Sequence, residues 1–454
     1  MNAPDRPIFE LSDAALRELA DDCLKQARAL GATDAVAEVS EGSGLAVTVR
    51  KGKVETIEQT RDKGLGVTVY VGQRRGHAST SDFSPAARAA TVRAAYDIAR
   101  HTGEDAFAGL PDEDTIEFSP PDLDLFHPWS IDAARAVEIA QAAEAAAFDT
   151  SPLIRNSEGA SVNVGHGRFA AANTRGFAAG YPYSRHSIAV SPIAGRGAQM
   201  QRDDWYTSSR EPGRLGDPAA IGRYAAERAL SRLHARRIPT CKVPVLFESP
   251  LALGLLGHFA QAASGAALYR QSTFLNLDAM HRPLFAGHVD VDENPHVPRE
   301  MGSAPFDDEG CVTRPRTVVE GGVLRGWFLS TYSARKLGLK TTGNAGGSHR
   351  LTLSSRRTKR GDDLRAMLRK LGTGLFVTDL MGQGVNYVTG DYSRGASGFW
   401  VERGEIAFPV EEITIAGNLR EMFLGIAAVG ADVIQRGGKR SGSVLIESMA
   451  VAGT

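Results

Sequence analysis

The chain has 454 residues, which is too long for one ordinary hydrophobic core, so we expect two domains. Its content of 42% hydrophobic and 23% charged residues is typical of a soluble globular protein. Because 52 basic residues nearly balance 53 acidic ones, for a net charge of -1, no overall field favours binding to nucleic acid or an anionic membrane.

Terminal and cysteine patterns indicate a cellular compartment. The opening residues, MNAPDRPIFELSD, lack the basic and apolar regions of a signal peptide. No run of about 18 apolar residues predicts a transmembrane helix. Cys23, Cys241 and Cys311 are too far apart in the chain to indicate a disulfide framework or a zinc site. We therefore expect reduced thiols and a cytoplasmic protein.

After a polar lead over residues 1–11, a helix is predicted that Ser12 or Asp13 caps and Gly31 ends. Its apolar positions recur at helical spacing, which places Cys23 in a core rather than in a reactive setting. Five strands then follow, separated by glycine-bearing turns at 42–44, 51–52, 62–64 and 72–73. These strands are predicted at 35–39, 45–50, 53–59, 65–71 and 75–80. Their alternation predicts an antiparallel meander with one covered face.

The rest of the first half is predicted to alternate helices with strands. Helices are expected at Pro85–His101, Ser130–Phe148 and Pro218–Leu233, with strand-like sequence over 159–207 and turns at 165–167, 175–176 and 195–197. The last of these helices carries Arg223, Arg228 and Arg232, which we interpret as a solvated cationic face. A linker near 235–243 then divides the chain into domains of 1–238 and 239–454.

The second half begins with a strand at Val243–Phe247 and a helix at Ser249–Ser264. Further strands are predicted at 317–320, 323–330, 351–353, 375–380, 399–401, 405–410, 413–415 and 443–451, with a short helix at 362–371. Glu402-Arg403-Gly404 joins two of them as a hairpin. The predicted fold class is therefore α+β, with two domains built on largely antiparallel, curved sheet and flanking helices.

No complete catalytic set is evident in the sequence. His258 lies in an apolar helix whose neighbours offer no metal ligand, so we interpret it as a packed histidine. His281, His288 and His296 share a loop at irregular spacing, which leaves open whether they meet around a metal. The turn Asp307-Asp308-Glu309-Gly310 lacks the ligand pattern of a calcium loop and is expected to be exposed.

Several longer segments identify the chain as similar to the TldD/PmbA family, once called modulators of DNA gyrase, and within it to the PmbA (TldE) branch. The segments that carry this resemblance are PFDDEG (305–310), YSARKLGL (332–339), TGNAGG (342–347), GVNYVTGDYSRG (384–395) and PVEEITIAGN (409–418). The resemblance implies a cytoplasmic heterodimer in which a TldD-type partner holds zinc through a helical HExxxH motif and a later Cys.

In this chain the matching helix reads Gly257-His258-Phe259-Ala260-Gln261-Ala262, and the late segment 428–443 has no Cys. We therefore expect no metal ligand, no cofactor and no catalytic residue in this chain, and zinc in the TldD-type partner. The resemblance implies action on unfolded peptides by the assembled pair, and a homodimer is expected when the partner is absent.

Within that hypothesis, the glycine-rich block supplies Asn386, Asp391 and Arg394 as candidate peptide-binding residues, which would hold an extended peptide by strand addition. For Arg394, a structural salt bridge is the alternative use, and the sequence favours it. Two other hypotheses remain open. One is a self-sufficient metallopeptidase with ligands from the scattered histidines, and the other is a modulator that binds DNA gyrase without hydrolysis.

Overall fold

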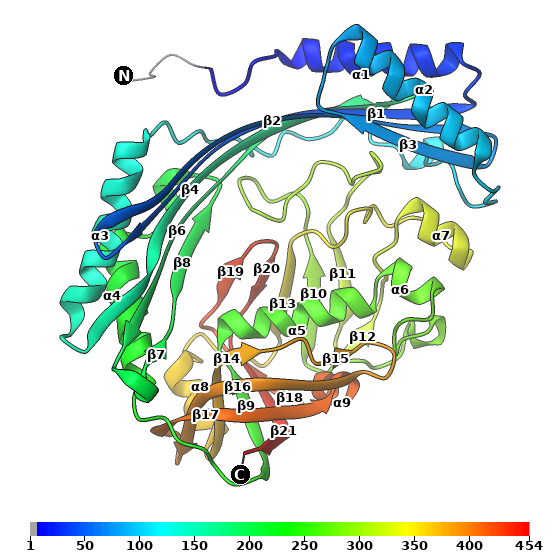
Figure 1. Ribbon diagram of the computed structural model, residues 1–454. Coiled ribbons are helices and arrows are strands. Elements are labelled where there is room, and N and C mark those ends of the chain that lie inside the picture. The colour runs from blue at the N-terminus through cyan, green and yellow to red at the C-terminus, as the bar shows by residue number, and fades with distance from the viewer. Residues whose placement is uncertain (1–6, 454) are drawn as a thin grey trace.

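The computed structural model describes residues 7–453, so the first six residues of the expected polar lead lie outside the described part. An N-terminal part, α1–α4 and β1–β8, arches over a C-terminal part, α5–α9 and β9–β21 (Figure 1). The arch is an eight-stranded antiparallel sheet in the order β3-β2-β1-β4-β6-β7, with β5 on β4 and β8 on β6. Its strands are β1 (Asp34–Arg50), β2 (Lys53–Val71), β3 (Arg74–Thr80), β4 (Ile154–Asn173), β5 (Ala178–Ala179), β6 (Pro182–Ala194), β7 (Gln201–Arg202) and β8 (Trp205–Ser209).

Where we predicted five short strands at the start of the arch, the structure has three strands, β1, β2 and β3. The turns expected at 42–44 and 62–64 are wrong, because both segments are extended inside the β1–β2 ladder, where 42–44 pairs with 60–62 and 62–64 pairs with 40–42. The turn expected at 165–167 is wrong for the same reason, since these residues pair with β1 and β6. Residues 53–63 of β2 are exposed on both faces, so the single covered face that we predicted begins only at Leu65.

Four helices cover the outer face of the arch: α1 (Asp13–Ala29), α2 (Pro85–His101), α3 (Ala133–Thr150) and α4 (Pro218–Ser231) (Figure 1). Their starts follow from local sequence, because the side chains of Ser12, Ser84, Asp132 and Asp217 each accept a backbone N–H of the first turn. Cys23 of α1 is fully buried in the core under α1 and α2, as predicted. The concave face of the arch is left for the C-terminal part.

The C-terminal part holds two sheets with α5 (Ser249–Ala262) between them (Figure 1). The six-stranded sheet runs β12-β11-β10-β13-β20-β19 and the seven-stranded sheet runs β14-β9-β21-β17-β16-β15, with β18 on β21. Most pairs are antiparallel, but β9–β14 and β13–β20 are parallel. β14 also pairs with β16, which closes part of the seven-stranded sheet into a ring.

The strands of the six-stranded sheet are β10 (Val289–Glu293), β11 (Arg316–Glu320), β12 (Val323–Leu324), β13 (Leu351–Ser355), β19 (Ile434–Arg436) and β20 (Lys439–Ser441). Those of the seven-stranded sheet are β9 (Cys241–Phe247), β14 (Gly374–Met381), β15 (Val385–Asn386), β16 (Asp391–Glu402), β17 (Glu405–Asn418), β18 (Ile426–Val429) and β21 (Val444–Ala452). The remaining helices are α6 (Gly265–Tyr269), α7 (Thr331–Leu337), α8 (Leu364–Leu371) and α9 (Leu419–Leu424).

The predicted strand at 323–330 is wrong beyond Leu324, because a loop and the capped start of α7 replace it. The predicted hairpin at Glu402–Gly404 is confirmed by the pairing of Glu402 with Glu405. Among the described residues, no helix is long and apolar enough to cross a membrane. The fold is α+β, with largely antiparallel, curved sheets and flanking helices, as predicted.

Candidate functional site

Helix α5 forms the centre of the C-terminal part. It begins after Glu248 with Pro250 in its first turn, where the missing N–H of proline costs no helical hydrogen bond. Leu255, Leu256 and Phe259 are buried in one hydrophobic core with residues of both flanking sheets. The helix is therefore fixed along its length, and its few polar side chains have defined surroundings.

His258 is the polar centre of α5. Its Nδ1 atom lies 2.8 Å from the hydroxyl oxygen of Tyr387, and its ring makes an edge contact with Tyr392. Burial, together with the positive charge of Arg394, lowers the pKa of His258 to about 4. Within residues 7–453, the buried hydroxyl of Tyr392 and the Nε atom of Arg394 have no hydrogen-bond partner. The side chains of His258, Tyr387, Tyr392 and Arg394 therefore form a cluster that carries no negative charge and is rich in hydrogen-bond donors.

The structure separates the three predicted peptide-binding residues. Arg394 lies beside His258 and donates to the Leu380 carbonyl at 3.4 Å. Asp391 is exposed and accepts hydrogen bonds from Thr389 and Asn418. Asn386 pairs with Asp391 across β15 and β16, and its side chain accepts the Val388 N–H. Asn386 and Asp391 therefore share one exposed turn, whereas Arg394 belongs to the group around α5.

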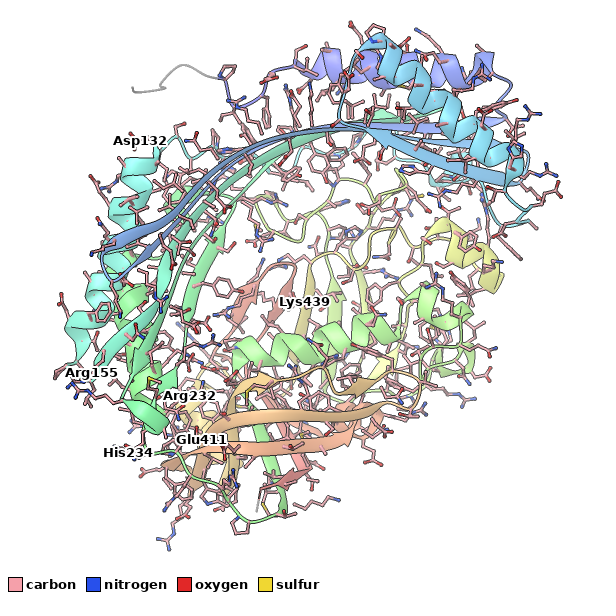
Figure 2. The ribbon with its side chains drawn as sticks, in the orientation of Figure 1. Asp132, Arg155, Arg232, His234, Glu411 and Lys439 are labelled. Atoms are coloured by element: carbon pink, nitrogen blue, oxygen red, sulfur yellow. The ribbon has the colours of Figure 1, made fainter. Side chains whose placement is uncertain are left out.

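The side chains around α5 do not fit a zinc ion. His258 offers one nitrogen, and its Nδ1 is already bonded to Tyr387, whereas a zinc site in a protein usually has at least three protein ligands. Lys439 of β20 approaches α5 next to His258, with its Cε 3.4 Å from the position of a Cβ on Gly257 (Figure 2). A lysine ammonium at this position repels a metal cation.

One other group of possible ligands occurs among the described residues, and it also suits no metal. Asp307, Glu309 and Cys311 lie within 4.8 Å of one another. However, Asp307 already accepts three backbone N–H groups, and Glu309 accepts the Thr331 N–H. Burial raises the pKa of the Cys311 thiol to about 12, which keeps it protonated. The hydrogen bonds of these side chains therefore stabilise the turn.

This turn corrects a prediction. Asp307 is 3% exposed, so the acidic turn is only partly exposed, and Asp308 alone of the pair remains accessible. The histidine loop likewise forms no metal site in the described chain. His288 contacts Ser355 and the Ile426 carbonyl, and His296 contacts Thr313, so each ring has its own partners. His281 takes part in neither the His288 contacts nor the His296 contact.

A second correction concerns the cationic helix face of α4. Arg228 and Arg232 are not solvated but mostly buried, and they join the N-terminal part to α5 and β14. Arg228 contacts Asp203 at 3.0 Å and Glu248, the residue before α5, at 2.6 Å. Arg232 contacts Asp203 at 3.4 Å and Asp379 at 3.1 Å, and Figure 2 shows it near the end of α4.

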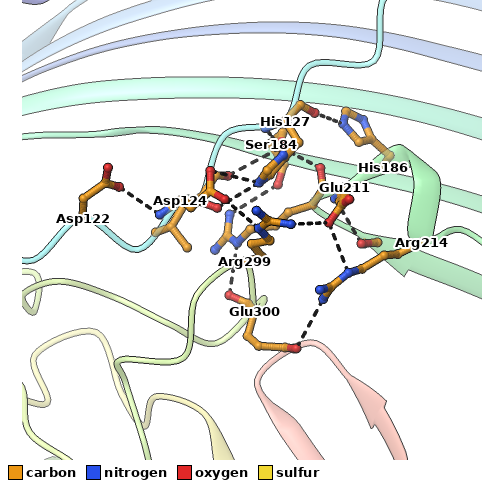
Figure 3. A network of polar contacts seen from close by, with 12 residues as sticks. Asp122, Asp124, His127, Ser184, His186, Glu211, Arg214, Arg299 and Glu300 are labelled. Carbon is orange, nitrogen blue, oxygen red and sulfur yellow. Dashed lines mark hydrogen bonds and ion pairs between the residues drawn. The ribbon is translucent and has the colours of Figure 1, made fainter.

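A second polar network joins the two parts near β6 (Figure 3). Arg299 from the C-terminal part contacts Asp124 at 2.6 Å and Glu211 at 3.4 Å. Arg214 then links Glu211 to Glu300. With the α4 network, these contacts hold the C-terminal part against the concave side of the arch.

A cleft with a volume of about 1510 Å³ lies between the concave face of the arch and loops of the C-terminal part. We call it the arch cleft. Its walls include side chains of β1–β4 on one side and the turn at 306–310 with Tyr269, Arg270 and Tyr332 on the other. Sequence reasoning missed it, although the alternation within β1 and β2 already predicted one free face.

Three domain models of one family match the chain in succession: PmbA/TldA metallopeptidase domain 1 at 35–99, the central domain at 126–233 and the C-terminal domain at 240–453. The protein named metalloprotease PmbA from Escherichia coli O157:H7 is 46% identical over 91% of this chain and 91% of its own length.

Two solved structures share the fold. A Bacteroides thetaiotaomicron protein described as a candidate modulator of DNA gyrase aligns with a TM-score of 0.90 and 25% identity, over 96% of this chain and 99% of its own. TldE from Thermococcus kodakarensis aligns with a TM-score of 0.83 and 17% identity, over 95% and 99% of the two chains. Since domain models cover most of the sequence and a relative matches it at 46% identity, the chain belongs to the PmbA/TldD metallopeptidase family.

Proposed function

We propose that this chain is the non-metal subunit of a TldD/TldE-type zinc-dependent peptidase that acts on unfolded peptides. The observation that carries the proposal is the chemistry around α5. A single histidine, bonded to Tyr387, lies beside the Arg394 guanidinium, and Lys439 approaches the preceding residue of the helix, Gly257. Such surroundings favour anions and peptide carbonyls over a metal cation, so a TldD-type partner would supply the zinc.

In this proposal the chain lines the substrate cleft of the assembled pair and holds the peptide there. β15 ends the seven-stranded sheet, so an extended peptide can add beside it through backbone hydrogen bonds. Asn386 and Asp391 would contact the peptide at this end. Arg394 would receive a carboxylate or carbonyl, because it forms no ion pair with any described residue and its Nε lacks a partner.

The test compares the chain alone with the chain co-expressed with a TldD-type partner. We expect zinc by mass spectrometry, and chelator-sensitive cleavage of an unfolded peptide, only in the co-purified pair. Stoichiometric zinc in the chain alone, with cleavage abolished by His258→Ala, would instead establish a self-sufficient metallopeptidase. Recovery of DNA gyrase but no TldD-type protein in a pull-down would favour the modulator hypothesis.

The peptide contact is tested in the assembled pair. Arg394→Gln should lower kcat/KM for an unfolded peptide about tenfold, since one charge-assisted hydrogen bond is lost. Arg403→Gln, in the exposed hairpin of the same sheet, is the matched control and should leave kcat/KM unchanged. Equal values for both variants would remove Arg394 from the proposed site.

A further inference from the structure

The arch cleft has a chemically uniform wall on its N-terminal side. Odd-numbered residues of β1 such as Ala35, Ala37 and Val39 are buried under α1 and α2, so the even-numbered residues face the cleft. Glu38 is the one carboxylate that β1 to β4 contribute to the cleft lining. Its cross-strand neighbours are small, namely Gly66 on β2, which the His77 ring covers, and Ala171 on β4.

The opposite wall contributes Asp308. Its carboxylate packs against the backbone of the 344–347 loop, where a Cβ on Gly346 would lie 2.2 Å from Oδ2. The turn that carries it is tied to the N-terminal part, since the Glu117 N–H donates to the Gly310 carbonyl and Gly310 packs on the Phe177 ring. Asp308 is therefore held rigidly in the cleft.

These two carboxylates differ from the other acids that line the cleft. Asp105 is bonded to Tyr332, Asp307 accepts backbone N–H groups, and Glu309 accepts the Thr331 N–H. Neither Glu38 nor Asp308 makes a side-chain hydrogen bond or an ion pair to any described residue. Both are reached by solvent, yet burial by the surrounding walls and the charge of Asp308 raise the pKa of Glu38. The two walls thus present carboxylates that no ion pair neutralises, with His349 as the basic side chain that acts on Asp308.

Of the basic residues in the cleft lining, Arg75 pairs with Tyr70, whereas Glu38 pairs with Gly66, four positions away along β2. His77 pairs with Thr68 and lies nearer to Glu38, because its Cε1 is 3.4 Å from the position of a Cβ on Gly66. Arg270 lies over the Tyr269 ring and Lys63 over the Phe83 ring. Aromatic side chains also line the cleft, namely the partly or fully exposed Phe169, Tyr181, Tyr183 and Tyr332, with Phe177 and Phe306 buried behind them.

We propose that the arch cleft binds a positively charged group of an extended peptide, a lysine or arginine side chain or an α-amino group, between Glu38 and Asp308. Two like charges that face one cleft from separate walls attract a cation to the space between them. The aromatic rings suit the aliphatic stem and the charged end of such a residue. A volume of about 1510 Å³ exceeds the roughly 300–1,000 Å³ of small-molecule sites and suits several peptide residues.

This proposal adds a substrate preference to the peptidase subunit proposed above. Only the choice of a peptide as the ligand rests on that proposed function. The test measures the Kd of the full chain for fluorescent, N-acetylated peptides that differ only in one central residue, lysine or norleucine. We expect the lysine peptide to bind about tenfold more tightly at low salt, and to lose this advantage at high salt. A third peptide, with a free α-amino group and no lysine, tells the two sources of the cation apart.

Glu38→Gln and Asp308→Asn should each remove most of the preference for whichever peptide carries the cation. Glu18→Gln, on the exposed side of α1, is the matched control and should preserve it. Because both variants relieve like-charge repulsion and keep side-chain shape, they should melt no earlier than the unaltered chain, which separates lost binding from lost folding.

Equal binding of charged and neutral peptides, no measurable binding of either, or a preference that survives both substitutions would overturn the proposal. The assay needs neither zinc nor a partner. The peptide preference and the zinc content of the assembled pair can therefore fail independently.

Discussion

The guanidinium of Arg228 on α4 donates to both carboxylate oxygens of Glu248, at 2.6 and 3.1 Å, immediately before the first turn of α5. The same guanidinium donates to Asp203 at 3.0 Å and to the Thr378 carbonyl at 3.4 Å. One side chain of the arch thus holds both the start of the central helix and the middle of β14. The position of α5 relative to the arch depends on this network.

Arg228→Met should lower the free energy of unfolding by about 3–5 kcal/mol, because it leaves Glu248 buried without its cation and Asp203 with Arg232 alone. Urea denaturation of the full chain measures this change. Arg223→Met on the same helix is the control, since Arg223 is exposed and its one ion pair, with Asp217, is long at 3.9 Å. This variant should change the free energy of unfolding by no more than about 0.5 kcal/mol. Similar stabilities for the two variants would contradict the role of the network.

The His258 ring should remain neutral throughout the physiological range, because burial and Arg394 lower its pKa to about 4. NMR titration of labelled histidines measures this pKa, and His258→Gln assigns the signal. Arg394→Gln should raise the pKa, since one of its two causes is removed, whereas Arg403→Gln should not. A His258 pKa near its ordinary value of about 6.5 in the unaltered chain would refute the description of this group.

The same shift predicts a stability change with a definite sign. The folded pKa of His258 lies below the unfolded one, so the unfolded chain binds more protons between about pH 6.5 and 4. The stability that the neutral ring contributes is therefore fully present above this window and is lost as pH falls through it. His258→Gln should make the unfolding free energy less dependent on pH there, which denaturation at several pH values measures.

The three cysteines should react in a fixed order with a thiol reagent. Burial raises the pKa of Cys23 to about 11 and that of Cys311 to about 12, whereas Cys241 is half-buried. Ellman's reagent should therefore modify Cys241 in the native chain and all three thiols in denaturant. Cys241→Ser should abolish the native reaction. Rapid native modification of Cys23 or Cys311 would contradict their burial.

Local signals in the sequence predicted the helices closely. The predicted bounds of α2, Pro85–His101, agree with the structure because Ser84 caps the helix and Pro85 fits its first turn. The strands of the arch were harder, because glycines at 42, 44 and 64 were interpreted as turns although each pairs with a neighbouring strand. A glycine marks either a turn or an open place on a sheet, and the sequence alone does not distinguish these.

The candidate sites show where sequence reasoning ends. Arg394 and His258 were both singled out, but their contact joins β16 to α5 over more than a hundred positions. Glu38 carried no signal, since it is one charge in an alternating strand, and its meaning depends on Asp308 in the other half of the chain. Likewise, Arg228 and Arg232 resemble a solvated face until the fold brings Glu248 and Asp379 to them.

Two glycines of the C-terminal part should respond in opposite ways to alanine. Gly254 is exposed within α5, and a Cβ there would meet no atom within 4 Å, so Gly254→Ala should stabilise the chain by about 0.5–1 kcal/mol through its helix propensity. A Cβ on Gly398 of β16 would lie 2.0 Å from the Phe376 carbonyl oxygen in the paired strand β14. Gly398→Ala should therefore cost at least about 2 kcal/mol, because that contact is to backbone inside the closed ring of strands. Thermal melts of the two variants against the unaltered chain measure both signs, and a stabilising Gly398→Ala would show that β14 and β16 do not pair as closely as described.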